Sequence, residues 1–221
     1  MLEYKNYEID VHLKSKIVTW AEYQMKIEEL AEQIDESSYD YVIGVFQGGY
    51  IVAMSLADYL FKAKTGGVVS DINVVVFTEA MKMDSGEIQG KSILLVDEVV
   101  ESGSSIKKCK NILTAYNVGK ISTACIYCNI YSNEKIDYFV ESFEGNKNFI
   151  FPWRINRDCV SLIMDVMQSN VGYDENTLIN EIKKTYGVNV SKDIIIDTLK
   201  SNKKIFNKKD GRWYVLRKEE K

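Results

Sequence analysis

The sequence predicts an α/β fold, in which a parallel sheet is flanked by helices, followed by a small α+β module at the C-terminal end. Over most of the chain, short β-branched runs alternate with stretches of helical periodicity, which is typical of a parallel sheet. Two of the strand-to-helix connections are rich in glycine or serine, at residues 47–50 and 102–105. In the last part of the chain the order changes to two helices and a hairpin.

Length and composition limit the organisation of the chain and the kinds of site it can carry. The 221 residues are 46% hydrophobic with a net charge of -4, which suits one domain of medium size plus an appendage, predicted as residues 1–169 and 170–221. The chain has neither an apolar run of about 20 residues nor a signal-peptide core, so we expect a cytoplasmic protein without membrane association. One histidine, His12, argues against histidine-dependent triads. We interpret Cys125 and Cys128 as structural thiols, because no second ligand pair accompanies their C-x-x-C spacing.

The first elements follow from capping signals and hydrophobic spacing. Thr19 and Glu22 form a capping box, and apolar residues continue behind them at helical spacing. An apolar and aromatic run at residues 39–46 predicts a strand, and a helix at 51–60 follows its glycine turn. A further valine-rich strand is predicted at 73–78.

The later elements are shorter and end in a hairpin signal. Apolar runs predict strands and helical spacing predicts helices, in the order strand 121–130, strands 137–140 and 148–151, helix 158–169, helices 176–186 and 191–200, and strands 204–207 and 213–216. The Asp-Gly pair between the last two strands is a strong signal for a tight hairpin.

The stretch at residues 92–106 carries the clearest chemistry. An apolar run that predicts a buried strand is followed directly by Asp97 and Glu98, then by two valines and Glu101. The Ser-Gly-Ser-Ser turn at 102–105 precedes a helix, so its backbone N–H groups and the helix N-terminus form a seat for phosphate. Carboxylates beside such a seat can accept from sugar hydroxyls or bind Mg²⁺. The stretch therefore predicts a phosphorylated sugar as ligand, with magnesium.

A plainer interpretation of the same stretch stays open. The turn could be an ordinary connection, with Ser104 or Ser105 as the N-cap of the following helix. The order of strand, acid pair and serine-glycine turn is more specific than the turn alone.

The stretch resembles the phosphoribosyl-diphosphate motif of the type I phosphoribosyltransferases, in which two acids and two apolar residues precede Asp-Thr-Gly-x-Thr. Glutamate replaces the aspartate here, and serine replaces both threonines. The resemblance implies that Asp97 and Glu98 hold the ribose hydroxyls, and the same carboxylates are the predicted Mg²⁺ ligands. It implies that Glu101 lies near the base and is the catalytic residue for proton transfer. The residues predicted to wrap the 5′-phosphate are Ser102, Gly103, Ser104 and Ser105.

A second glycine turn matches the family's pyrophosphate loop. Gly48 and Gly49 let the backbone approach an anionic ligand closely, although an ordinary glycine connection would have the same sequence. In the family this loop carries a basic residue where Gln47 stands, and glutamine cannot neutralise pyrophosphate charge. The polar segment at 79–90 lies where the family has a flexible loop over the reacting sugar, and an exposed hairpin tip would have a similar composition.

The segment at 137–153 resembles the purine branch of the family, especially its xanthine-guanine and hypoxanthine enzymes. The resemblance implies transfer of ribose 5-phosphate from phosphoribosyl diphosphate to a purine or purine-like base, in nucleotide salvage, by a homodimer. Asn129 stands where that branch has a lysine that donates to the base, and the stacking aromatic falls at Asn148 or one place on, at Phe149. Arg154 replaces the usual glutamate after Pro-Trp. The base pocket is therefore the part of the family pattern that this sequence matches least well.

The C-terminal module, residues 170–221, resembles a winged helix and is basic. It holds 12 lysines and arginines against 8 acids, in a chain whose total charge is -4. Such modules more often serve packing, dimerisation or lid roles in enzymes, and nucleic-acid contact is the less favoured interpretation. The alternative function is a regulator that senses phosphoribosyl diphosphate and binds nucleic acid through this module.

Overall fold

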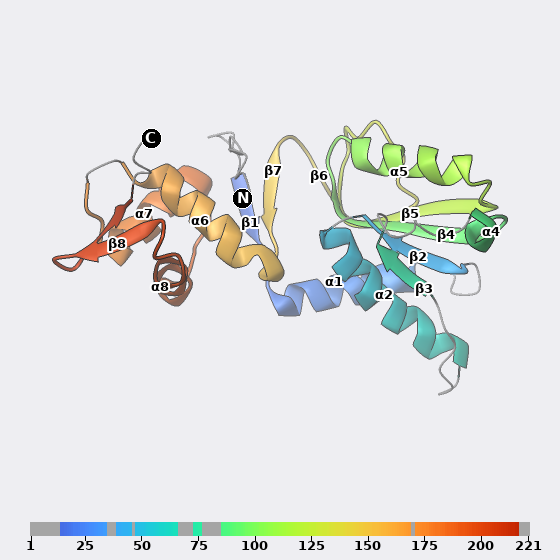
Figure 1. Ribbon diagram of the computed structural model, residues 1–221, viewed down its shortest axis with the longest axis horizontal. Coiled ribbons are helices and arrows are strands. Elements are labelled where there is room, and N and C mark those ends of the chain that lie inside the picture. The colour runs from blue at the N-terminus through green and yellow to red at the C-terminus, as the bar shows by residue number, and fades with distance from the viewer. Residues whose placement is uncertain are drawn as a thin grey trace. The chain divides into compact units, whose positions relative to one another are not determined.

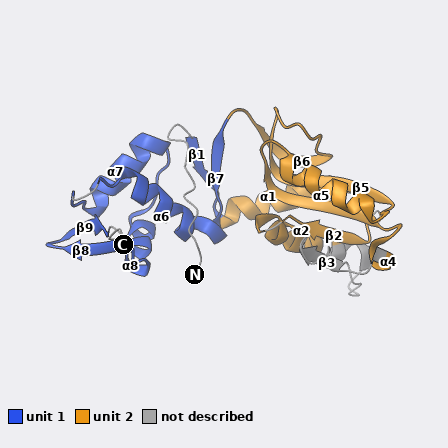
Figure 2. Cartoon of the chain, turned by 45° about the horizontal axis from the view of Figure 1, so that its top comes forward, with its two compact units in different colours: residues 1–19, 146–221 blue, residues 20–145 orange. Residues whose placement is uncertain are grey.

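Two compact units divide the chain. The computed structural model describes residues 14–34, 39–45, 47–65, 73–76, 85–168 and 171–216. One unit comprises residues 20–145, and the other combines residues 1–19 with 146–221 (Figure 2). The prediction of domains at 1–169 and 170–221 stays a prediction, although the helix at 155–166 falls in the same unit as the C-terminal module.

A five-stranded parallel sheet forms the centre of the first unit, as the sequence predicted. Its strand order is β3-β2-β4-β5-β6, and every neighbouring pair is parallel. The strands are β2 (Tyr41–Gly44), β3 (Asn73–Val76), β4 (Ser92–Val100), β5 (Lys120–Asn129) and β6 (Tyr138–Phe143). The apolar residues of β2 and of the first half of β4 are buried, as expected for a sheet covered on both faces.

Helices cover both faces of this sheet. Helix α1 (Trp20–Glu32) and helix α2 (Gly48–Thr65) lie on one face, and helix α5 (Ser104–Ala115) lies on the other (Figure 1). Each turns an apolar stripe inward: α1 buries Tyr23, Ile27 and Leu30, and α5 buries Ile106, Cys109 and Leu113. A short helix, α4 (Ser85–Ile88), precedes β4. It falls in the second half of the predicted flexible loop at 79–90, and the first half, residues 79–84, lies outside the described residues.

Two predicted boundaries near the acid pair were wrong. Strand β4 continues to Val100, so Asp97 and Glu98 lie within the strand rather than after it. The reason is the ladder to β5, whose register runs as far as Val100↔Cys128. Helix α2 begins at Gly48, three residues before the predicted start, so both glycines belong to its first turn.

The second unit begins with a separate pair of strands. Strand β1 (Lys14–Ile17) pairs in parallel with β7 (Lys147–Ile150), outside the five-stranded sheet. After a single 3₁₀ turn at Pro152–Arg154, helix α6 (Ile155–Val166) follows. The fold predicted from the resemblance includes a small hood, and this strand pair is separate from the five-stranded sheet.

Three helices and a hairpin share one core in this unit (Figure 1). Helix α7 (Glu175–Tyr186) and helix α8 (Lys192–Ser201) pack on α6, and β8 (Phe206–Lys209) pairs antiparallel with β9 (Arg212–Val215). Capping fixes the helix boundaries: Asp174 and Ser191 accept from backbone N–H groups at the starts of α7 and α8, and Gly187 ends α7 with φ 72°. No helix in the described ranges is long and apolar enough to cross a bilayer.

One carboxylate attaches the hairpin to α7. Glu175 Oε1 accepts from Lys208 Nζ and from Trp213 Nε1, both at 2.9 Å. The Trp213 hydrogen bond and then the Lys208 hydrogen bond lower the pKa of Glu175 from 4.5 to about 2. Because the folded pKa is depressed, the stabilisation is present above pH 4.5 and is lost as pH falls toward 2.

We expect Glu175→Gln to destabilise the module at neutral pH and to have less effect in acid. Thermal unfolding followed by tryptophan fluorescence from pH 7 to pH 2 measures this, and the melting curves of the variant and the parent should converge near the low end. Glu181→Gln, on the same helix without such partners in the described structure, is the control and should leave the pH profile unchanged. A constant difference at every pH would contradict the assignment.

Candidate functional site

The first turn of α2 lies directly against the two acids of β4. A Cβ added to Gly48 would overlap the Glu98 carboxylate. A Cβ added to Gly49 would lie 2.5 Å from the Val96 carbonyl oxygen and 3.0 Å from Asp97 Cα. At Gly49 the obstruction is backbone, so only glycine fits there, whereas at Gly48 a side chain would require the Glu98 carboxylate to move. The fold thus brings together the glycine turn and the acid pair, which are about fifty residues apart in the sequence.

The two acids occupy different environments because adjacent strand residues point to opposite faces. Asp97 is half-buried, and its Oδ1 accepts from the backbone N–H of Glu98 at 2.8 Å. Burial, followed by the Asp97 charge, raises the pKa of the Cys109 thiol on α5 to about 11. Glu98 is only 7% exposed and lies on the α1 side, where its charge adds to burial in raising the pKa of Tyr23 to about 12.

The serine-glycine turn after β4 forms the N-terminus of helix α5. Gly103 is the N-cap of α5, with φ 78°, so the interpretation with Ser104 or Ser105 as N-cap was wrong. Ser102 Oγ accepts from the backbone N–H of Ser104 at 3.3 Å. The first N–H groups of a helix have no partner within it, and the helix dipole adds partial positive charge there. The turn therefore offers an anion seat.

The side chains around this seat are open to solvent. Glu101, Ser102, Ser104 and Ser105 are exposed, and only Gly103 is buried. These residues lie at the carboxyl end of β4, the edge of a parallel sheet where ligands of such folds bind. The phosphate-wrapping and catalytic roles predicted for them stay predictions.

Asn129, predicted to contact the base, makes local backbone contacts with both ends of its amide. Its Nδ2 donates to the Gly145 carbonyl at 2.9 Å, and its Oδ1 accepts from the Tyr131 N–H at 3.0 Å. It thereby fixes the segment that leaves β5. Base recognition by Asn129 stays a prediction, because both ends of its amide are hydrogen-bonded to the backbone here.

The segment that follows Asn129 contacts the serine-glycine turn at 102–105. Sequence reasoning missed this contact. The N–H of Asn133 donates to the Ser102 carbonyl at 3.1 Å. Gly103 packs on the same segment, since a Cβ there would lie 2.7 Å from Ser132 Oγ and 2.8 Å from Glu134 Cβ. The polar run 131–134 is a turn signal, yet nothing in it indicates which turn it contacts.

Glu134 connects this segment to α5. Its carboxylate lies 3.1 Å from Lys110 Nζ and 3.9 Å from Lys107 Nζ, with the Glu134 side chain 15% exposed. Helix α5 and the serine-glycine turn before it therefore both contact the 131–134 segment.

Phe149, the predicted stacking aromatic, lies in the other compact unit. It is 2% exposed in β7, and Lys147 Nζ lies 5.6 Å from its ring centroid. Arg154, which departs from the family pattern, donates from Nη2 to the Phe149 carbonyl at 3.0 Å and lies 3.6 Å from Asp158 through Nε. Arg154 thus links β7 to α6. Stacking of a base on Phe149 stays a prediction.

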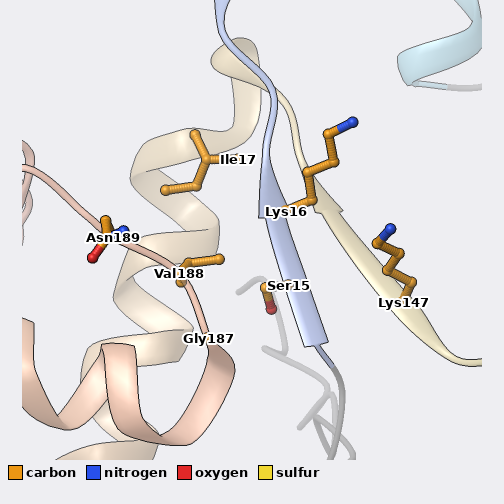
Figure 3. Close-up of a pocket in the computed structure, with 7 residues that line it drawn as sticks. All are labelled: Ser15, Lys16, Ile17, Lys147, Gly187, Val188 and Asn189. Carbon is orange, nitrogen blue, oxygen red and sulfur yellow. The ribbon is translucent and has the colours of Figure 1, made fainter.

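A shallow pocket in that unit includes none of the predicted site residues. It is lined by Ser15, Lys16, Ile17, Lys147, Gly187, Val188 and Asn189. Lys16 and Lys147 point to the opposite side of the strand pair from Ile17 and Val188 (Figure 3). The two lysines therefore lie on the other side of the strand pair from the apolar part of the lining.

Sequence comparison finds relatives in one family. Residues 15–158 match the family described as phosphoribosyl transferase domains. A hypoxanthine-guanine phosphoribosyltransferase of Aquifex aeolicus is 24% identical over 127 residues, which cover 51% of this chain and 68% of that protein.

Structural comparison agrees. A purine phosphoribosyltransferase from Pyrococcus horikoshii is similar with a TM-score of 0.51 and 23% identity, over 64% of this chain and 94% of that one. A xanthine-guanine-hypoxanthine phosphoribosyltransferase of Helicobacter pylori gives 0.52 and 17%, over 68% and 99%. Together with the domain match, these similarities confirm the fold and the resemblance inferred from the central motif.

We expect Gly103→Ala to cost more stability than Gly90→Ala. Both glycines have positive φ, 78° and 71°, but an added Cβ meets Ser132 and Glu134 at Gly103 and nothing within 4 Å at Gly90. Backbone strain should cost each variant about 1 kcal/mol, and the clash should add about 1–3 kcal/mol at Gly103 alone. Urea unfolding measures both. Equal losses would show that the 131–134 segment does not constrain the turn.

Proposed function

Because this chain belongs to the phosphoribosyltransferase domain family and is an enzyme of that class, we propose that it transfers ribose 5-phosphate to a purine or purine-like base. In the proposed reaction the C1–oxygen bond to pyrophosphate breaks and a C1–nitrogen bond to the base forms. The base loses its N–H proton and pyrophosphate is released, as in nucleotide salvage. Phosphoribosyl diphosphate and a nucleobase are then the substrates.

The observation that carries this proposal is the contact of Gly48 and Gly49 with the acid pair. It places a helix N-terminus, two carboxylates and the open serine-glycine turn at the ends of adjacent strands. A phosphorylated sugar with a pyrophosphate leaving group needs N–H donors for the 5′-phosphate and for the pyrophosphate. It also needs hydrogen-bond acceptors for the ribose hydroxyls between them.

In the proposed mechanism the residues mainly position charge. The N–H groups at the start of α5 would hold the 5′-phosphate, and those at the start of α2 would face the leaving pyrophosphate. Asp97 would accept from a ribose hydroxyl, being the more accessible of the two acids. Glu101, exposed at the end of β4, would take the proton from the base nitrogen as the new bond forms.

The residues also suit Mg²⁺ as cofactor. Asp97, the more accessible acid, offers the carboxylate oxygens that this ion prefers, whereas Glu98 is buried and points to the opposite face, so its role as a Mg²⁺ ligand stays a prediction. Within the described residues no cluster of three or more acids, histidines or cysteines could hold a metal alone. Mg²⁺ bound through one or two carboxylates needs phosphate and water oxygens to complete its shell. When bound, the ion would neutralise charge on the leaving group.

The choice of base is proposed from the three similar proteins named above, whose names indicate purine substrates. The identities are low, and the residues expected to read the base differ from the family pattern at Asn129 and Arg154. A purine-like ring is therefore proposed as a class. The homodimer and the cytoplasmic location stay predictions.

We predict that Glu101→Ala lowers turnover by about 10²- to 10⁴-fold, because a positioned proton acceptor contributes on that order. Calorimetry with phosphoribosyl diphosphate and Mg²⁺ measures binding, and pyrophosphate release with a panel of bases measures turnover. The dissociation constant for phosphoribosyl diphosphate should stay within about twofold, since Glu101 is placed at the base and not at the phosphates.

Glu32→Ala, an exposed carboxylate at the end of α1, is the control and should keep full activity. Magnesium-dependent binding without release for any base would favour the sensing regulator over the enzyme. Absence of binding to the parent protein would refute the proposed site.

A further inference from the structure

One short segment concentrates positive charge in an acidic protein. Residues 200–212, which we call the cationic hairpin, contain six lysines and arginines against one acid. This is a net +5 in a chain whose total is -4. The segment comprises the end of α8, the turn after it, β8 and the start of β9.

Most of these cations have no partner in the part of the chain that the structure describes. The exposed side chains without an ion pair or hydrogen bond there are Lys200, Lys203, Lys204, Lys209 and Arg212. Lys208 differs, because it is bound to Glu175 and lies 5.1 Å from the Trp213 ring centroid. One lysine thus attaches the hairpin to its own module, and five remain available to a partner.

The strand register separates a packing face from an open face. Phe206 and Trp213, on the inner side, are 1% and 6% exposed. Lys209 pairs directly with Arg212 next to the turn, and both are exposed, on the face that alternates with the inner one. The hairpin tip projects beyond the helices of its unit (Figure 2). A partner can therefore reach this cation pair without disturbing the core.

The chemistry of the segment favours a hydrated polyanion. None of the exposed large apolar side chains lies within 200–212, so the hairpin has nothing to insert into a lipid layer. Arg212 and the lysines are donors suited to phosphate oxygens spaced along a backbone. The surrounding protein is acidic, but at physiological salt its field is largely screened beyond about 8 Å.

Helix α8 supports a duplex as the partner. It packs on α6 and α7 just before the hairpin, an order that resembles the helix and wing of a winged helix. Outside the cationic hairpin, its exposed charged residues are Lys192 against Asp193 and Asp197. Such a helix offers polar groups to base edges but little net attraction, so the attraction comes from the hairpin.

We propose that the cationic hairpin binds the phosphate backbone of duplex DNA, with Lys209 and Arg212 as direct contacts. This contact is independent of the transferase reaction. Its signature is a salt dependence proportional to the number of phosphates neutralised, because each contact releases condensed counterions.

The test is fluorescence polarisation of the full chain with a labelled DNA duplex, between about 50 and 200 mM salt. The double variant Lys209→Ala/Arg212→Ala should weaken binding about tenfold at low salt. It should also reduce the slope of log K against log salt by about 2, because two phosphates are no longer neutralised.

The matched control is Lys183→Ala/Lys184→Ala, which removes two exposed cations from the far end of α7. Those residues lie about 12 Å along the helix axis from Glu175, where the hairpin is attached. The control should keep both affinity and slope. Equal weakening by the two variants, absence of binding at low salt, or tighter binding to anionic vesicles than to the duplex would each overturn the proposal.

Discussion

The close approach of the α2 N-terminus to strand β4 is the constraint on which the candidate site depends. Gly48 and Gly49 lie where a Cβ would collide with the acid pair or its backbone, and Gly44 at the end of β2 likewise has no room beside Tyr50. These three glycines let a helix begin directly on the strand ends. The parallel register Gly44↔Val96 then holds the helix start and the carboxylates at one edge of the sheet.

Most of the fold could be predicted from the sequence, because hydrophobic periodicity and turn-forming residues such as glycine indicate local structure. The parallel sheet, the serine-glycine turn before α5 and the Asp-Gly hairpin followed from such signals. The end of β4 did not, because its extension through Asp97 and Glu98 depends on pairing with β5, a partner distant in sequence. The same limit applies to the support of Ser102 by Asn133 and to the amide contacts of Asn129.

The second unit shows that a departure from a family pattern can have a structural cause. Arg154 looked like a change in the base pocket, but it connects the Phe149 carbonyl to Asp158 at the start of α6. Helix α6 in turn shares its core with α7, α8 and the hairpin. The arginine therefore belongs to the connection between β7 and the C-terminal helices, and substrate choice need not explain it.

The left-handed geometry of Gly103 has a consequence for ligand affinity. A glycine turn in a free loop would sample many conformations and would lose that entropy when an anion bound. Here the turn is fixed from behind by Ser132, Asn133 and Glu134, so the entropy is lost during folding. For an anion bound at the start of α5 as proposed, the turn would be preorganised, and more of the electrostatic attraction would remain as net binding free energy.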